Sequence, residues 1–336
     1  MQPNFSLVFF TTLAGMSQGL LFYIAIFKSQ FNLLSNSFLT NLALPVSFGL
    51  LIASLLASFF HLGHPERAWR AAHMWRTSWL SREVIVLPLF ITTVILAWYF
   101  SAQDKSFPII WLAIVILAFL LWICTAQIYQ CIKFIQEWAH PLTFINFLVL
   151  GLTSGWLLFG SLIWFWSDAI ENAYVKLIPA IGVALLFIAL TIKLTIWKRN
   201  RGLKPKSNLN SAIGIPNTRI RQISMGLMGG SFNTREFFHN QTNLVLDNLR
   251  KIILFGAYLF PILILVYALQ SSTFSAVFIA LIVHLIGLMC ERWMFFAEAN
   301  HPQKFSGVHQ QELWHHRQAA QLCVPRRFWL HRAGDL

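Results

Sequence analysis

The sequence contains little charge. Lys, Arg, Asp and Glu make up 11% of its 336 residues, while hydrophobic residues make up 57%. A soluble globular domain usually carries about 25% charged residues. A chain of this composition lacks the polar surface that a soluble monomer needs. The sequence therefore predicts an integral membrane protein.

Cysteine is also scarce. The chain has only four cysteines, and no two of them form a C-x-x-C pair: Cys124, Cys131, Cys290 and Cys323. A ferredoxin-type iron–sulfur cluster needs about four thiolates in close runs. We therefore expect no iron–sulfur cluster in this chain, and we interpret the cysteines as free thiols.

Acidic residues are few compared with basic ones. The chain has 12 acidic and 25 basic residues, which gives a formal net charge of +13. The basic residues gather in segments between apolar runs, so the excess charge does not indicate a nucleic-acid-binding surface. It fits membrane lipid headgroups, which attract basic segments beside a spanning helix.

Long apolar runs dominate the rest of the sequence. Each of eight runs is about the length that crosses a bilayer as a helix: 5–27, 39–60, 84–102, 109–130, 142–166, 174–197, 252–269 and 275–296. Strands of a membrane barrel would be shorter and would alternate strictly. The first run is too long for the apolar part of a signal peptide. The predicted fold is an all-α integral membrane protein, a bundle of eight transmembrane helices.

The connecting segments predict an orientation and a domain division. Most Lys and Arg residues outside the runs fall on one face, and the positive-inside rule then places both termini in the cytoplasm; an acidic partner docking on that face is the competing interpretation. We expect one membrane domain over 1–303, with a long cytosolic-type loop over 198–251. The atypical segment 304–336 is predicted to be a disordered tail.

The connection between the second and third runs has unusual chemistry. It reads HLGHPERAWRAAHMWRTSWLSRE over 61–83 and is rich in arginine and tryptophan. On an ideal helix from Pro65, one face carries Ala68, Ala72, Trp75 and Trp79, and the opposite face carries Arg67, Arg70 and His73. This pattern predicts an amphipathic helix in the membrane interface, where tryptophan is common.

An interfacial helix does not explain His61 and Glu83, which should lie near the hydrocarbon edge, where charge is costly unless paired or solvated. Quinol oxidation needs such groups, because a quinol releases two electrons and two protons. A neutral imidazole can accept one proton, and a nearby carboxylate can stabilise the imidazolium or pass the proton on. Arg67 or Arg82 could keep Glu83 ionised. The alternative is a helix-end histidine and a glutamate paired with Arg82.

The 61–83 stretch resembles the H-L-G-x-P-x-R-A…L-S-x-E stretch of the DmsC family, the membrane anchors of bacterial dimethyl-sulfoxide reductase. GGSFNTREFFH (229–239) and ERWMFFAEANHPQ (291–303) are similar to further stretches of that family. The resemblance covers about 1–303. It implies that His61 and Glu83 are catalytic and that His61, Gly63, Arg67 and Glu83 bind the quinol.

The same resemblance implies a complex in the bacterial inner (cytoplasmic) membrane, with this chain as a multi-pass anchor. Its partners would be a four-cluster ferredoxin-like iron–sulfur subunit and a molybdopterin catalytic subunit. The bound substrate would be menaquinol, with no haem, iron–sulfur cluster or metal in this chain. His64 and Arg82 depart from some relatives, and the segment from about Lys304 does not look like the family.

Three alternatives remain open on the sequence alone. A secondary transporter would show repeats or midplane ionisable groups; Lys176, Lys193 and Asp168 lie near helix ends, where we interpret them as snorkelling to the surface. A di-haem protein needs facing histidine pairs within the membrane, and only His284 lies deep in a run. A purely structural anchor would hold partner subunits without quinol chemistry.

Overall fold

The computed structural model describes residues 4–29, 34–60, 62, 64–166, 176–203, 214, 243–271, 273 and 275–299. Within these residues the regular structure is helical throughout, without strands. The described helices belong to one compact unit, which comprises Gln2–Leu203 and Thr242–Ala299. The prediction of an all-α fold is confirmed.

Eight helical stretches in the described part of the chain are long and apolar enough to cross a membrane. Six of them are single helices: α1 (Phe5–Ser29), α4 (Trp79–Ala102), α5 (Pro108–Gln130), α6 (Pro141–Phe165), α8 (Leu177–Arg201) and α13 (Ser275–Ala297). The other two stretches are composite. One joins α2 (Asn36–Phe38), the π-helical turn η1 (Leu39–Ala43) and α3 (Leu44–Phe59). The other runs from Asn248 to Ser271 and joins the second half of α11 (Asn243–Ile253), the π-helical turn η3 (Leu254–Leu259) and α12 (Phe260–Ser271).

These eight stretches match the eight predicted apolar runs, and their ends differ from the predicted ends by a few residues. The predicted loop 198–251 is helical at its described ends, because α8 continues to Arg201 and α11 begins at Asn243. Most of the rest of that loop (204–213 and 215–242, which include the 229–239 motif) and the 304–336 tail lie outside the described residues. The domain division therefore stays a prediction.

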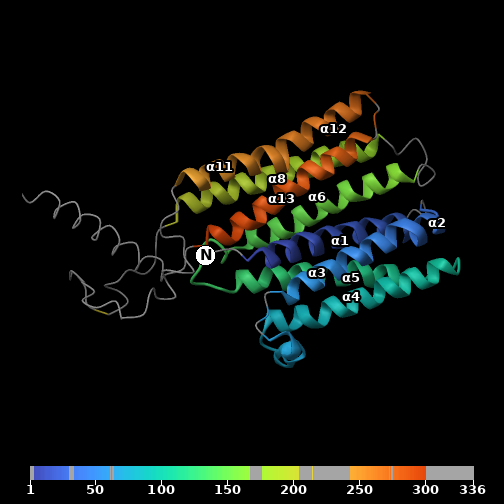
Figure 1. The fold of residues 1–336 in the computed structure, drawn as a ribbon, viewed down its shortest axis with the longest axis horizontal. Helices are drawn as coiled ribbons and strands as arrows, with labels where there is room; N and C mark the ends of the chain where they lie inside the picture. Colours follow the sequence, from blue (N-terminus) through green and yellow to red (C-terminus); the bar gives the residue numbers. More distant parts are fainter. Residues whose placement is uncertain are drawn as a thin grey trace, which may run out of the picture. The chain divides into compact units, whose positions relative to one another are not determined.

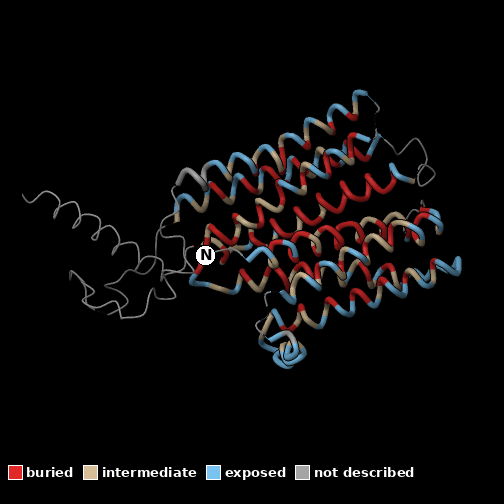
Figure 2. The backbone as a smooth tube through the Cα atoms, in the orientation of Figure 1, coloured by how far each residue is buried: buried red, intermediate tan, exposed pale blue. Residues whose placement is uncertain are grey.

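Helices α1 and α6 form the centre of the bundle. In the most apolar part of each of these two helices, 67% of the residues are buried inside the protein. The corresponding share for Asn36–Phe59 is 28%. Helix α1 packs on α3, α5, α6 and α13, and α6 packs on α1, α5, α8 and α13. Figure 2 shows buried residues concentrated on the central helices and exposed residues frequent on the outer helices.

Glycines allow α1 and α6 to approach closely. A Cβ atom on Gly155 would lie 2.3 Å from the carbonyl carbon of Gly19, and one on Gly19 would lie 2.1 Å from the carbonyl oxygen of Gly151. Small residues permit such contacts between membrane helices, which associate mainly through van der Waals packing. The G-x-x-x-G pattern at Gly151 and Gly155 therefore packs against α1 within the bundle.

One end of the bundle carries the candidate site. At this end α3 ends at Phe59, α4 begins at Trp79, α8 ends at Arg201 and α13 ends at Ala297 (Figure 1). We call this end the basic face, because the arginine-rich segment between α3 and α4 lies there. The side of the membrane on which it lies stays a prediction.

Candidate functional site

The segment between α3 and α4 forms a helix, as predicted, but of a different kind. It is the 3₁₀ helix η2 (Pro65–Met74), with Pro65 in its first turn. Three residues per turn keep Arg67, Arg70 and His73 on one face. Trp79 is not part of it, because Ser78 caps a new helix, α4, by accepting a hydrogen bond from the Ser81 amide at 3.4 Å.

Arg82 ties these two helices together. Its Nε donates to the carbonyl of Trp75 and its Nη2 donates to the carbonyl of Arg76, each at 2.9 Å. Its guanidinium also lies 4.1 Å from the ring centroid of Trp79. The alternative interpretation, in which Arg82 pairs with Glu83, does not agree with these contacts. The guanidinium instead satisfies carbonyls that the end of η2 leaves without partners.

Glu83 lies inside the protein near the start of α4. Its exposed fraction is 5%, and it lies four residues from Trp79, about 6 Å along the helix axis. The hydroxyl of Thr125 on α5 donates a hydrogen bond to Glu83 Oε1. A buried carboxylate with one hydroxyl partner, close to a membrane surface, has the chemistry of a proton acceptor or donor.

The other predicted site residues are less informative. Arg67 lies on η2 with its side chain 60% exposed, and its Nε is 3.9 Å from Glu66 Oε1. Glu66 also contacts His64, with Nδ1 3.0 Å from Oε1. The described ion pairs and hydrogen bonds do not connect Arg67 with Glu83. His61 and Gly63 lie outside the described residues, so their roles stay predictions.

Exposed apolar side chains lie on the segment between α3 and α4. On η2 and the turn after it, Trp69, Met74 and Trp75 are exposed by 67%, 61% and 53%. The guanidinium groups of Arg70 and Arg76 lie 5.5 and 5.4 Å from the centroids of their neighbouring tryptophan rings. Aromatic and basic side chains together are typical of the membrane–water interface, which agrees with the predicted setting of η2.

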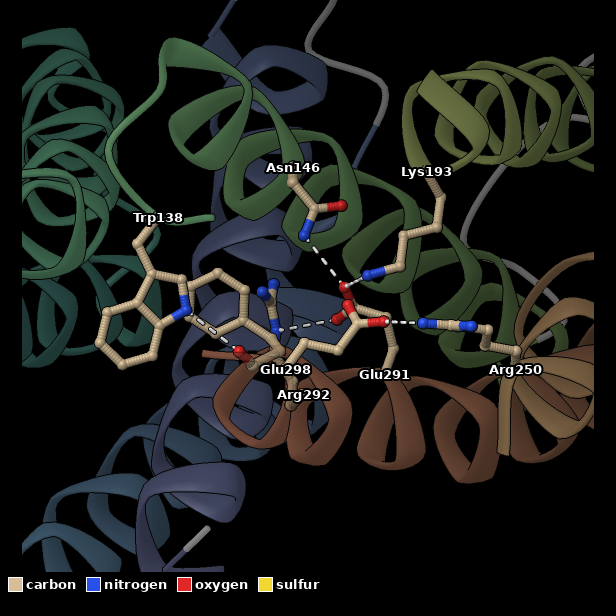
Figure 3. Close-up of polar contacts among 8 residues, drawn as sticks. Trp138, Asn146, Lys193, Arg250, Glu291, Arg292 and Glu298 are labelled. Atoms are coloured by element: carbon tan, nitrogen blue, oxygen red, sulfur yellow. Dashed lines mark hydrogen bonds and ion pairs between the residues drawn. The ribbon is translucent and has the colours of Figure 1, made fainter. Parts of the chain in front are cut away.

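A second polar group, which we call the Glu291 cluster, lies in the other half of the bundle. It contains Asn146 of α6, Lys193 of α8, Arg250 of α11, and Glu291, Arg292 and Glu298 at the end of α13 (Figure 3). Glu291 Oε1 accepts hydrogen bonds from Lys193 Nζ at 2.7 Å and from Asn146 Nδ2 at 3.0 Å. Arg292 Nε lies 3.7 Å from Glu291 Oε2, and Arg250 pairs with Glu298 at 3.0 Å.

Sequence reasoning missed this cluster. It interpreted Lys193 as snorkelling to the surface, and this interpretation is wrong, because the Lys193 side chain is 2% exposed and bonded to a fully buried carboxylate. Glu291 and Arg292 lie inside the last predicted apolar run, and ionisable residues in such a run indicate a functional site. The sequence therefore contained a signal for Glu291 and Arg292. It did not indicate Asn146, Lys193 or Arg250, because these come from three other helices.

A narrow cleft reaches the cluster from the basic face. Its walls are formed by α6, α8, the end of α13 and the connection before α6. The lining residues are Leu142, Thr143 and Asn146 of α6, Lys193, Ile196, Arg199 and Asn200 of α8, Phe295 of α13, Glu298 just after it, and Glu137 and Trp138 of the connection. Trp138 Nε1 donates to the carbonyl of Phe295 at 3.0 Å, which fixes one wall (Figure 3). The pKa of His140, which precedes α6, is lowered mainly by partial burial and to a smaller extent by the positive charge of Arg199.

The comparisons with known proteins agree with this architecture. The family model of the DMSO reductase anchor subunit (DmsC) matches residues 1–297. The chain belongs to the DmsC family. It is thus a multi-pass membrane protein and the membrane-anchor subunit of a molybdopterin oxidoreductase complex. The family resemblance seen in the sequence is confirmed.

One curated relative of this DmsC-family anchor is a sulfite dehydrogenase subunit from Allochromatium vinosum. It is 41% identical over 324 residues, which cover 90% of this chain and 98% of the relative. No solved structure matches the chain. Among the described residues, no group of three or more His, Cys, Asp or Glu side chains is arranged to hold a metal ion.

Proposed function

We propose that this anchor binds a membrane quinone beside Glu83 and exchanges electrons with an iron–sulfur partner subunit. The observation that carries the proposal is the Glu83–Thr125 pair, a buried carboxylate about 6 Å beneath the basic face. A quinone headgroup enters from the lipid at this depth. The exposed Trp69 of η2 and Trp75 just after it would form an amphipathic border for such an entrance.

The proposed chemistry is proton transfer at Glu83. Oxidation of a quinol releases two protons and two electrons, and a buried carboxylate in contact with the hydroxyl accepts one proton as it leaves. Thr125 orients the carboxylate through its hydrogen bond. His61, Gly63 and Arg67 are proposed as further quinol-site residues, and His61 as a second proton acceptor, because they flank η2 or lie on it.

The electrons must leave the chain, because its four cysteines lack the close spacing that a cluster needs. We propose a four-cluster ferredoxin-like iron–sulfur subunit as the acceptor and a molybdopterin subunit as the terminal catalyst. In a reductase complex of the kind that gives the family its name, the anchor oxidises menaquinol. The proposed location is the bacterial inner membrane.

The curated relative favours the opposite direction as a second candidate. A sulfite dehydrogenase withdraws electrons from sulfite, and a relative with that name is 41% identical over nearly the whole chain. In such a complex the anchor reduces a quinone, and Glu83 supplies a proton instead of accepting one. By microscopic reversibility the same residues serve both directions, so the Glu83 site belongs to either function.

The test compares wild type with Glu83→Gln in membranes that contain the whole complex. Glutamine keeps an oxygen that accepts from Thr125 but cannot take up a proton. We expect quinone-linked turnover to fall by about 10²–10⁴-fold, while turnover with an artificial electron donor or acceptor for the partner subunits stays unchanged. Fluorescence titration with a quinol analogue, for wild type and variant, locates the site.

Two results would decide against the proposal. Equal quinone-linked turnover in wild type and Glu83→Gln would leave a purely structural anchor. Uptake of a solute by this chain alone in vesicles, without analogue binding, would favour a transporter. The direction of electron flow is read from the quinone absorbance in two assays. In one the complex receives sulfite and a quinone, and in the other it receives a sulfoxide and a quinol.

A further inference from the structure

The charges of the Glu291 cluster do not balance. Lys193 and Arg292 face the single carboxylate of Glu291, and all three side chains are at most 2% exposed. The neighbouring pair of Arg250 and Glu298 is neutral as a unit. An excess positive charge buried in a membrane domain is costly. Releasing one proton from the cluster removes the excess, and of these cations only lysine can release one.

Buried polar atoms without a hydrogen-bond partner gather around the same carboxylate. Within the described residues they include Glu291 Oε2, Arg292 Nε and Nη1, the Tyr258 hydroxyl and His284 Nε2. Trp197 Nε1 also lacks a partner, and the centroid of its ring lies 5.6 Å from Lys193 Nζ. His284 lies two helical turns before Glu291 on the same side of α13, and Tyr258 directly follows Ala257, whose carbonyl contacts His284. The group contains donors and acceptors, so water, which both donates and accepts, is the ligand that suits it.

The backbone around these atoms is also irregular. Tyr258 belongs to the π-helical turn η3, and single π-helical turns are frequent at functional sites. His284 Nδ1 lies 2.7 Å from the carbonyl of Ala257 in the same turn. If Nδ1 carries the proton and donates to that carbonyl, Nε2 is an acceptor. Helix α13 comes close enough for this contact because Gly287 lies against the backbone of Ala257.

The cleft joins the cluster to the basic face. Lys193 and Asn146 both line the cleft and both bond to Glu291, so they separate the carboxylate from the cleft. The cleft is wide enough to hold water. Lys193 lies eight residues before Arg201, so the route is about 12 Å long along the helix axis.

Tyr129 connects the cluster to the Glu83 site. It lies one helical turn after Thr125 on α5, the residue that donates to Glu83. Its ring is stacked on Phe147, with centroids 5.8 Å apart, and the Arg292 guanidinium lies 3.9 Å from the centroid of that ring. Contacts between the two polar sites therefore run through two aromatic rings, Tyr129 and Phe147.

We propose that Lys193 and Glu291 form a second proton-transfer site, which exchanges protons between the interior of the bundle and water at the basic face. In one step the Lys193 ammonium gives a proton to water in the cleft and becomes a neutral amine. It regains a proton from the polar group around Glu291, which Tyr129 links to the quinone site. The inference rests on the proposed function, because quinone turnover supplies or consumes the protons.

The groups that face this site come from every element packed against it. On α13 and just after it they are His284, Arg292 and Glu298; on α11 and η3, Arg250 and Tyr258; on α8, Arg199; on α5, Tyr129; and in the connection before α6, Glu137. Of these, His284, Tyr258, Tyr129, Glu137 and Glu298 can accept and release a proton, whereas the arginines stay charged.

The test substitutes Lys193 in two ways. Lys193→Arg keeps the positive charge and the ion pair with Glu291 but cannot release a proton, and Lys193→Met removes both. We expect each variant to lower quinone-linked turnover by at least about 10-fold and to raise the solvent isotope effect on turnover. Lys28→Arg is the matched control. Lys28 is also a buried lysine, and its Nζ donates to the Leu34 carbonyl at 3.0 Å, but it lies at the end of α1 that is far from the basic face.

Two measurements separate this inference from the proposed function. Quinol-analogue binding and turnover with an artificial donor should be unchanged in both Lys193 variants, whereas Glu83→Gln tests the quinone site itself. If Lys193→Arg turns over quinone like wild type, while Lys193→Met lowers both thermal stability and turnover, the cluster is only a structural ion pair. Wild-type turnover and isotope effect in both variants would also overturn the proposal.

Discussion

Replacing Gly155 with alanine tests the central helix contact of the bundle. The added Cβ would meet three backbone atoms of α1: the Gly19 carbonyl carbon at 2.3 Å, the Gly19 Cα at 2.4 Å and the Leu20 nitrogen at 2.4 Å. Backbone atoms cannot turn aside as a flexible side chain can. Helices α1 and α6 therefore have to move apart.

The size of the effect follows from these distances. Ordinary van der Waals contact starts near 3.4 Å, so the closest pair must separate by about 1.1 Å. A gap of 0.5–1 Å already removes roughly a quarter to a half of each dispersion contact. Inserting one methyl group into a packed interior costs about 1–3 kcal/mol of folding free energy. We expect Gly155→Ala to lower stability by at least this amount, because the whole interface opens.

The assay is thermal unfolding in detergent, followed by the fluorescence of the buried tryptophans. Gly49→Ala is the matched control: Gly49 also lies in a spanning helix, α3, but a Cβ there would meet nothing within 4 Å. This control should match wild type or gain about 0.5–1 kcal/mol from alanine's better helix propensity. Equal midpoints for Gly155→Ala and Gly49→Ala would refute the close contact between α1 and α6.

Three further predictions concern the two polar sites. Thr125→Val removes the hydroxyl that donates to buried Glu83; it should cost about 1–3 kcal/mol in chemical unfolding, and an unchanged midpoint would contradict the pairing. Arg82→Gln removes two hydrogen bonds to the end of η2; limited proteolysis should cut the segment between α3 and α4 faster than in wild type, and equal rates would exclude this role. Glu291→Leu leaves Lys193 and Arg292 buried without their carboxylate; it should cost about 3–5 kcal/mol, and Glu291→Leu/Lys193→Met should recover part of the loss.

The functional part of the site was only partly accessible from the sequence. Glu83 stood out because a carboxylate at the edge of an apolar run is costly unless it has a role. Its partner Thr125 did not stand out, since it lies 42 positions away on the next helix. Arg82 was expected beside Glu83, yet successive residues on a helix point about 100° apart, and its side chain reaches back to η2.

The sequence by itself determined the eight spanning helices, because bilayer thickness fixes the length of an apolar run and lipid leaves a backbone little choice but to be helical. It also determined the basic stripe of Arg67, Arg70 and His73, which an α-helix and a 3₁₀ helix both preserve. The tertiary structure decided which ionisable groups meet. Lys193 joins Glu291 across 98 positions because α8 and α13 rotate their polar sides toward each other, and hydropathy along one helix carries no information about that rotation.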